Sequence, residues 1–247
     1  MLHEGSDWMS IPRLVVVQTG SAAKEIVAKH GDYPAWFNRA LGAELPVVRV
    51  DLGAPLELPA GTRGVVVSGS PFSLTEPEPW MMDAAEELLR IGERGTPVLG
   101  VCFGHQMLGR AAGSQVVQNP KGREIGTVRV QLTADGRRDP LFRGWAPEDG
   151  VIEVQATHLD AVAEVPNEAT LLASNEKCAT QAFRFSDAVA SVQFHPELDP
   201  DTLRAVIDSR ASAIRREGLA PERLRAGVRQ TDSAQVLRAF ADEARRS

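Results

Sequence analysis

The stretch Pro97-Val-Leu-Gly-Val-Cys-Phe-Gly-His-Gln106 is the most informative part of this chain. Its first five residues form an apolar run, which is typical of a strand buried on both faces. The run leads directly into Cys102, with Gly100 two residues before it and Gly104 two residues after it. This spacing is the thiol version of a strand–nucleophile–helix elbow, G-x-S-x-G with cysteine in place of serine. The pattern therefore predicts a strand over 97–101 and a helix that begins just after the cysteine.

Each feature of this elbow suits a cysteine nucleophile. A sharp turn lifts the side chain of Cys102 off the carboxyl edge of the sheet, where open α/β sheets bind ligands. Glycines at positions 100 and 104 remove Cβ atoms that would collide where strand and helix meet. The helix N-terminus favours a thiolate and supplies free backbone N–H groups for a developing oxyanion. A free cysteine is more commonly a small buried hydrophobic residue, but the flanking glycines favour the nucleophile.

Elements on both sides of the elbow are predicted from their hydrophobic patterns. Before it, strands are expected over 13–18, 46–50 and 64–68, and helices over 33–41 and 79–93. After it, strands with few helices between them are expected over 125–132, 151–156, 171–174, 180–185 and 189–194. Two helices are expected at the end of the chain, over 200–216 and 232–245.

This order of elements predicts an α/β fold. Apolar strands that alternate with helices favour a central, mostly parallel sheet flanked by helices, with right-handed crossovers. The strands of the second half are expected to form an antiparallel extension or a second small sheet. No internal repeat or clear linker interrupts residues 1–247, so we expect one domain, with its motifs within about 64–198 and a helical C-terminal extension over 199–247.

The composition of the 247 residues excludes several classes of protein. Hydrophobic residues make up 43% and charged residues 24%, the balance of a globular protein. A formal net charge of −6 argues against a nucleic-acid or anionic-membrane binder, and no apolar segment is long enough to cross a bilayer. Residues 1–10, MLHEGSDWMS, lack the basic and apolar regions of a signal peptide, so a reduced, cytoplasmic setting is expected.

A cysteine nucleophile needs a base, and the base needs an orienting group. Of the five histidines, His195 stands out because it follows an apolar strand in Val192-Gln-Phe-His-Pro-Glu197. Residues two apart in an extended chain point the same way, so Glu197 can hold the imidazole in one tautomer, as a triad carboxylate does. A strand-end histidine followed by a turn proline is the simpler interpretation, but the elbow at Cys102 favours the catalytic one.

The turn Gly69-Ser70-Pro71 ends another predicted strand and should lie at the same sheet edge as Cys102. Its backbone N–H groups are candidates for an oxyanion hole, although a plain tight turn explains the same residues. His105 has no companions at ligand spacing, and we expect neither a metal nor a cofactor. The second cysteine, Cys178, lies in a surface-like Asn-Glu-Lys-Cys context and is interpreted as structural or incidental.

Taken together, several segments resemble the class I glutamine amidotransferase family. In chain order they are Ser68-Gly-Ser-Pro71, Gly100-Val-Cys-Phe-Gly-His-Gln106, Arg123-Glu-Ile-Gly126, Thr157-His-Leu-Asp160 and His195-Pro-Glu197. The third and fourth segments, with Leu171-Leu-Ala-Ser-Asn175 and Gln181-Ala-Phe183, are similar to the branch that resembles the glutaminase domain of GMP synthetase. Many members of that branch are stand-alone proteins, and plant γ-glutamyl peptidases lie nearby. The resemblance implies a flavodoxin- or Rossmann-like sheet.

The resemblance also implies a role for each matching residue. Cys102 would attack the side-chain amide of glutamine, with His195 as base and then acid and Glu197 orienting it. A γ-glutamyl thioester would form, ammonia would leave and water would release glutamate. The oxyanion would be held by backbone N–H groups of the turn and elbow, at Gly69, Ser70 and Phe103. The two ends of the substrate would be held by Gln106, Thr157, His158, Leu159 and Asp160.

Two positions depart from the family's pattern. The family usually has glycine directly before the proline of its oxyanion turn, where this chain has Ser70. We therefore expect Ser70 to take a strained backbone or to shift the turn. Leu159 stands where relatives often have a small residue, which would reshape the pocket.

Three functions remain open at this point. The chain has no Ser-Gly-Gly-Val-Asp-Ser pyrophosphatase loop, so the leading hypothesis is a glutaminase that supplies ammonia to a separate synthase. The same Cys102, His195 and Glu197 serve a γ-glutamyl peptidase acting on peptides or conjugates. The third alternative is a non-catalytic regulatory module, against which the complete set of three residues argues. The expected ligand is glutamine or another γ-glutamyl small molecule, with no nucleic acid and no membrane as partner.

Overall fold

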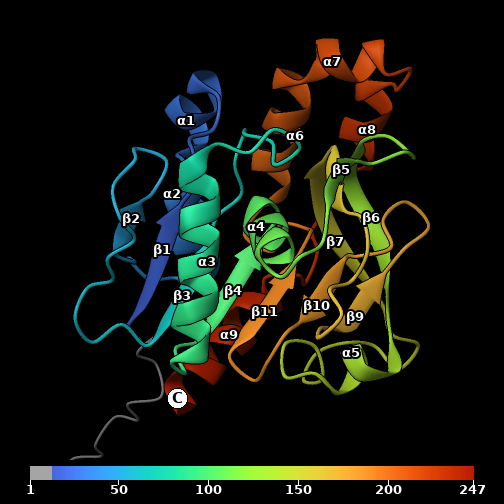
Figure 1. Cartoon of the computed structure of the whole chain (residues 1–247). Coiled ribbons are helices and arrows are strands. Elements are labelled where there is room, and N and C mark those ends of the chain that lie inside the picture. Colours follow the sequence, from blue (N-terminus) through green and yellow to red (C-terminus); the bar gives the residue numbers. More distant parts are fainter. Residues whose placement is uncertain (1–12) are drawn as a thin grey trace, which may run out of the picture.

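The computed structural model describes residues 13–247, so the expectation about residues 1–10 lies outside the described range. A nine-stranded mixed sheet forms its centre, in the order β2-β1-β3-β4-β11-β10-β9-β6-β7 (Figure 1). Its first five strands are parallel, namely β2 (Val47–Arg49), β1 (Leu14–Gln18), β3 (Gly64–Val67), β4 (Val98–Val101) and β11 (Val189–Val192).

The other half of the sheet is antiparallel. It consists of β10 (Ala182–Arg184), β9 (Thr170–Ser174), β6 (Glu124–Leu132) and β7 (Val151–His158). A separate antiparallel pair joins β5 (Val116–Gln118) to β8 (Asp160–Val162). The chain thus has both an antiparallel extension and a small second sheet, the two forms that the sequence left open.

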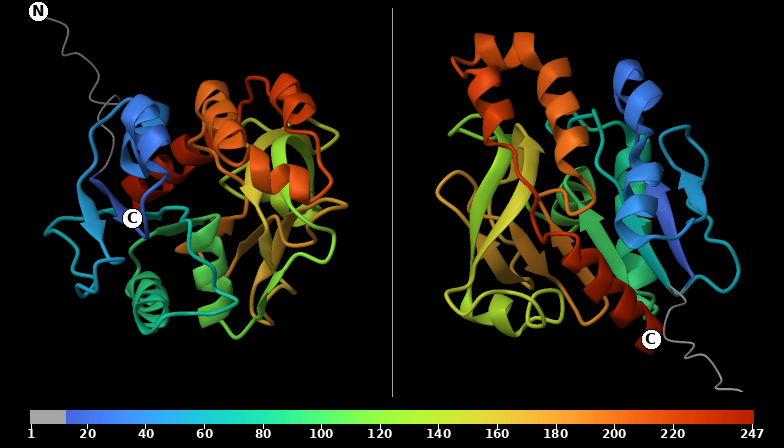
Figure 2. Two further views of the ribbon diagram at one scale, coloured as in Figure 1. Left: turned by 90° about the horizontal axis from the view of Figure 1, so that it is seen from above. Right: turned by 180° about the vertical axis from the view of Figure 1, so that it is seen from behind.

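Helices cover both faces of the parallel half (Figure 2). Helices α3 (Pro79–Glu93) and α4 (Phe103–Ala111) pack on one face, against the valines of β3 and β4. Helices α2 (Tyr33–Leu41) and α9 (Gln235–Arg246) pack on the other face. Strands β1, β3 and β4 are buried along their whole length, which explains their unbroken apolar sequences.

A third group of helices lies at the carboxyl edge of the parallel strands, at the top of Figure 1. It contains α1 (Lys24–His30), α6 (Pro200–Ser209), α7 (Ala211–Arg216) and α8 (Pro221–Gly227). Their apolar side chains share a core with the start of α2, including Ile26, Trp36 and Leu203. The remaining helix, α5 (Ala134–Arg138), lies at the opposite end, beside β9. The carboxyl edge, where Cys102 was expected, is therefore enclosed by helices.

The predicted fold class is confirmed, with several local corrections. Strand β11 joins the parallel half instead of the extension, because it pairs with β4. The helix expected over 200–216 is two helices, which meet at Arg210. Helices α1 and α8 were not predicted, since seven residues are too few to show a clear helical period. Cys178 is buried, although its sequence context indicated the surface.

Among residues 13–247, no helix combines the length and the hydropathy that crossing a bilayer requires.

Candidate active site

Cys102 lies at a sharp turn between β4 and α4. Its backbone has φ 51° and ψ −98°, and it is the only non-glycine residue with positive φ among residues 13–247. Its N–H donates to the carbonyl of Val192 in β11 at 2.9 Å, which ties the turn to the neighbouring strand. Such a backbone costs about 1–3 kcal/mol and is found mainly at functional sites. The side chain thus has the elbow geometry that the sequence predicts.

Close packing around the elbow requires the two glycines. A Cβ atom at Gly100 would lie 2.6 Å from the carbonyl oxygen of Gly104. A Cβ atom at Gly104 would lie 2.8 Å from the carbonyl oxygen of Val67. Since both obstacles are backbone atoms, they cannot rotate away as a side chain would. The glycines therefore allow β3, β4 and α4 to converge at Cys102.

His195 and Glu197 form a buried pair beside the elbow. The imidazole Nδ1 lies 2.7 Å from Glu197 Oε1, and both residues are 3% exposed. Burial acts to lower the pKa of His195, but the Glu197 carboxylate and the neighbouring sulfur of Cys102 outweigh it and raise that pKa to about 10. With Nδ1–H donated to the carboxylate, Nε2 is the ring nitrogen left to exchange a proton with sulfur or substrate.

The turn after β3 lies against His195. A Cβ atom at Gly69 would lie 2.8 Å from Cε1 of His195, 3.2 Å from Cε1 of Tyr33 and 3.7 Å from Cβ of Cys102. These distances place histidine and cysteine side by side over the glycine. Any side chain at position 69 would displace the imidazole.

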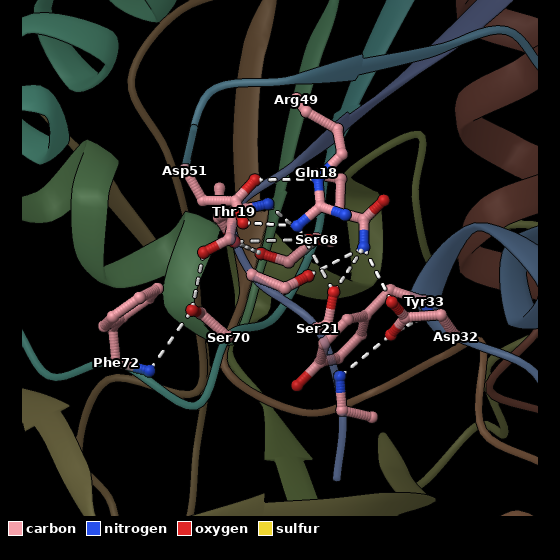
Figure 3. Close-up of polar contacts among 12 residues, drawn as sticks. Gln18, Thr19, Ser21, Asp32, Tyr33, Arg49, Asp51, Ser68, Ser70 and Phe72 are labelled. Atoms are coloured by element: carbon pink, nitrogen blue, oxygen red, sulfur yellow. Dashed lines mark hydrogen bonds and ion pairs between the residues drawn. The ribbon is translucent and has the colours of Figure 1, made fainter. Parts of the chain in front are cut away.

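Ser70 stands where the family usually has glycine, but its backbone is not strained. Its φ lies outside the left-handed region. Its Oγ donates to the carbonyl of Thr19 at 2.7 Å and accepts from the N–H of Phe72 at 3.2 Å (Figure 3). The side chain thus ties the turn to the loop after β1. Phe103 is the first residue of α4, so its N–H has no partner within the helix and is a second candidate oxyanion donor.

The residues predicted to hold a substrate line one cavity with the cysteine. This larger cavity has a volume of about 550 Å³. Gln106 donates from Nε2 to the carbonyl of Asp160 at 2.9 Å, so α4 and the predicted binding loop are joined. The Asp160 carboxylate accepts from Ser73 Oγ at 2.5 Å. The predicted residues on its wall are Ser70, Cys102, Phe103, Gln106, Thr157, His158, Leu159 and Asp160.

The side chain of His158 is already held by protein groups. Its Nε2 lies 3.0 Å from Glu124 Oε2, and its Nδ1 lies 3.0 Å from the carbonyl oxygen of Asp160. Glu124 also accepts from Asn175 and Gln181, at 2.7 and 2.6 Å. Burial acts to raise the pKa of Glu124, but these partners outweigh it and lower that pKa. Both ring nitrogens of His158 therefore have protein partners, and the imidazole supports the binding loop.

A smaller cavity of about 290 Å³ adjoins the larger one at Cys102. His195, Tyr33 and Arg210 line it. Sequence analysis gave no role to Tyr33, Glu124 or Arg210. Glu124 lies in a quoted family segment, but Arg210 falls in the middle of a predicted helix and carries no local signal. Among residues 13–247, no group of three or more His, Cys, Asp or Glu side chains is placed to hold a metal ion.

Comparison with known proteins gives the family. Residues 38–209 match the family model described as glutamine amidotransferase class-I, and this range covers well over half of the chain. The chain belongs to the class I glutamine amidotransferase family. Its membership confirms the resemblance found in the sequence.

Similar proteins include a peptidase and a synthase. Gamma-glutamyl peptidase 3 of Arabidopsis thaliana is 32% identical over 145 residues, which are 59% of this chain and 58% of the relative. A glutamine-hydrolysing GMP synthase of Edwardsiella ictaluri is 30% identical over 193 residues, which are 75% of this chain and 34% of the relative. The match therefore spans less than two thirds of the length of either curated relative.

A solved structure shows the same fold. The crystal structure of a glutamine amidotransferase from Thermotoga maritima has a TM-score of 0.75 and covers 96% of this chain and 100% of its own. Its sequence is 22% identical to this one. The likeness confirms the predicted fold class.

Proposed function

We propose that this class I amidotransferase hydrolyses the amide bond at the γ-carbonyl carbon of a γ-glutamyl group. The observation that carries the proposal is the strained elbow of Cys102 beside the His195–Glu197 pair. The sulfur of Cys102 attacks the γ-carbonyl carbon, a C–S bond forms, and the C–N bond breaks as His195 gives its proton to the leaving nitrogen. Water then attacks the thioester, its proton passes to His195, the C–S bond breaks, and glutamate leaves.

Other residues serve this reaction by position. Glu197 keeps Nδ1 of His195 protonated and stabilises the imidazolium. Backbone N–H groups of Ser70 and Phe103 are assigned to the oxyanion, and Gln106 with residues 157–160 to the γ-glutamyl group in the larger cavity. Ser70 lies in the turn after β3, Phe103 is the first residue of α4, and both line the larger cavity with Cys102.

Two substrates fit this chemistry. Glutamine, with ammonia passed to a separate acceptor enzyme, is supported by the family and by the GMP synthase relative. A γ-glutamyl peptide is supported by the peptidase relative and by the smaller cavity beside His195. Both share the thioester and differ only in the leaving group.

An intact-mass experiment tests the thioester site. Wild type, Cys102→Ala and Cys178→Ser are treated with a glutamine-mimicking electrophile. Cys178 is the matched control, because burial raises the pKa of its thiol and it lies outside both cavities. We expect one adduct on wild type and Cys178→Ser, and none on Cys102→Ala. Glutamate release from glutamine and from γ-glutamyl peptides then ranks the substrates.

The same experiment can reject the proposal. An adduct that persists in Cys102→Ala would place the reactive thiol elsewhere. A thiol no more reactive than free cysteine, with no glutamate from any substrate, would favour the non-catalytic module.

A further inference from the structure

The two cavities meet at Cys102 but have different walls. Both are lined by Ser70, Cys102, Thr157 and Arg210. Gln106 and Asp160 line the larger cavity, whereas His195 lines the smaller one. The nucleophile therefore lies between a space that holds the predicted binding residues and a space that holds the proton donor.

This placement fixes the direction of a bound substrate. A general acid must be within hydrogen-bond reach of the nitrogen that it protonates. With the γ-glutamyl group beside Gln106, the leaving nitrogen departs on the side of His195, into the smaller cavity. Ammonia, similar in size to water, needs only about 30 Å³. The smaller cavity has about 290 Å³ and accommodates a leaving group of amino-acid size.

The wall of the smaller cavity has both apolar and polar parts, and Ser21, Thr157, His195 and Ser209 are among its polar residues. Ile26, Trp36, Leu198 and Val206 supply its apolar surface. Arg210 is the one Lys or Arg among the described residues that line it, and no Asp or Glu among them does. The space therefore combines apolar surface with the guanidinium of Arg210 and the imidazole of His195.

The guanidinium of Arg210 has N–H groups available for a ligand. Its Nη1 donates to Thr157 Oγ1 at 2.6 Å, and among residues 13–247 it forms no ion pair with a carboxylate. Arg123, on the larger cavity, is instead held by both oxygens of Glu217 at 2.8 Å. Burial lowers the pKa of Arg210, the expected effect where a guanidinium is desolvated without a paired carboxylate. A carboxylate is the ligand that a planar guanidinium binds best.

Hydrogen bonds hold Ala22 and Tyr33, which also line the smaller cavity, in place before any ligand binds. Gln18 donates from Nε2 to Asp32 Oδ2 at 2.9 Å, and Asp32 Oδ1 accepts from the N–H groups of Ala22 and Tyr33, each at 2.9 Å (Figure 3). These bonds join the loop after β1 to the start of α2. A preformed wall lowers the conformational cost of binding.

We propose that the smaller cavity binds the leaving half of a γ-glutamyl peptide, and that Arg210 pairs with the carboxylate of the released amino acid. This inference rests on the proposed function and deepens it. The substrate class is a γ-glutamyl amide of an α-amino acid with an apolar side chain. The C–N bond breaks as described above. The carboxylate of the released amino acid stays paired with Arg210.

Matched substrates test the inference directly. Wild type, Arg210→Met and Arg210→Lys are assayed for glutamate release from γ-glutamyl-leucine, γ-glutamyl-leucinamide and glutamine. We expect wild type to prefer the free carboxylate over the carboxamide by about 10- to 100-fold in kcat/KM, the range for a charge-assisted hydrogen bond. Arg210→Met should lose this preference, because its kcat/KM should fall about 10- to 100-fold more on γ-glutamyl-leucine than on leucinamide and glutamine. Arg210→Lys should keep part of it.

The control is Arg216→Met, an exposed residue of α7 outside both cavities. It should keep the wild-type preference. Equal losses on all three substrates in Arg210→Met would overturn the inference, because they would assign Arg210 to the γ-glutamyl half or to Thr157. A wild type without preference for the carboxylate would overturn it too. If wild type releases no glutamate from any substrate, the proposed function itself fails.

Discussion

A positive φ at Cys102 has to be held by its surroundings, because a residue with a Cβ atom leaves that region when it is free to do so. The bond from its N–H to Val192 and the packing of Gly100 against Gly104 supply this restraint. The restraint positions the sulfur at the cost of stability. Removing the Cβ atom should therefore recover part of that cost.

Cys102→Gly should accordingly be more stable than Cys102→Ala. Glycine adopts φ 51° and ψ −98° without steric strain, whereas alanine keeps the clash. Relief of strain favours the glycine variant by about 1–3 kcal/mol, whereas the greater entropy of glycine in the unfolded chain disfavours it. We therefore expect the free energy of unfolding of Cys102→Gly to exceed that of Cys102→Ala by about 1 kcal/mol. Urea unfolding of the two variants measures it. An alanine variant as stable as the glycine variant would show that the elbow is not strained.

Glu197→Gln tests the charge that holds His195. The carboxylate helps to raise the pKa of His195 from 6.5 to about 10, so the imidazolium stabilises the fold fully below pH 6.5 and loses this effect as pH rises through about 10. The gap in Tm between wild type and Glu197→Gln should therefore narrow from pH 6 to pH 10. The alkaline limb of kcat/KM should move to lower pH, and kcat should fall about 10²- to 10⁴-fold.

The exposed Glu222→Gln serves as the control for this charge change, since its pairing with Arg215 lies on the surface. It should leave the rate profile unchanged. A pH-independent Tm gap for Glu197→Gln would contradict the assigned ion pair.

The sequence predicts some of these residues better than others, for a physical reason. Cys102 is marked by glycines two residues away, and Glu197 is two residues from His195, so short spacings reveal them. Arg210 acts on Thr157, 53 residues away, and nothing local marks that contact. Glu124 and Gln181 are likewise joined only by the fold. Functional residues close together in the sequence could be predicted, whereas contacts between residues far apart in the sequence could not.

At the scale of elements, the convergence of β3 and α4 should depend on the lack of a side chain at Gly104. Gly104→Ala places a Cβ atom 2.8 Å from the carbonyl oxygen of Val67, so the helix must move away from the strand. We expect a loss of about 1–3 kcal/mol in the free energy of unfolding, together with lower activity, because the helix carries the N–H of Phe103. Urea unfolding and glutamate release measure the two effects.

Gly227→Ala is the matched control, since a Cβ atom at the end of α8 meets nothing within 4 Å. It should change the free energy of unfolding by less than about 0.5 kcal/mol. If Gly104→Ala were as well tolerated, close packing would not be the reason for glycine in the elbow.

Element boundaries were predictable where one pattern ran without interruption. Helices α2 and α3 span the predicted residues because a proline lies in the first turn of each one and an apolar stripe runs along it. The break between α6 and α7 was missed, since residues 200–216 keep a helical pattern through Arg210. The partner of β11 was also missed, because an apolar run does not show which strand it pairs with. Pairing depends on the whole sheet.

At the scale of the whole molecule, the C-terminal helix α9 completes the core. Leu237 and Phe240 are buried against the parallel sheet together with residues of β1, β3 and β4. Arg184 on β10 bonds to both Asp139 and Glu243, and so connects the antiparallel half to this helix. The arginine lies between two carboxylates with little exposure. Its positive charge therefore helps to keep the two halves of the sheet and the helix together.

Arg184→Met should destabilise the protein by about 3 kcal/mol near pH 7.5, because it leaves the buried Asp139 carboxylate and the half-buried Glu243 carboxylate without their cation. Burial already raises the pKa of Glu243, although Arg184 opposes it, and loss of the arginine raises that pKa further. Between the unfolded pKa of 4.5 and the raised folded value, the folded variant binds more protons than the unfolded chain. Its stability therefore falls as pH rises through this window, so the loss of stability should be smaller at pH 5.

Urea unfolding at pH 7.5 and pH 5 measures this loss, with the exposed Arg238→Met on α9 as control. A defect of equal size at both pH values would show that Arg184 acts by packing alone.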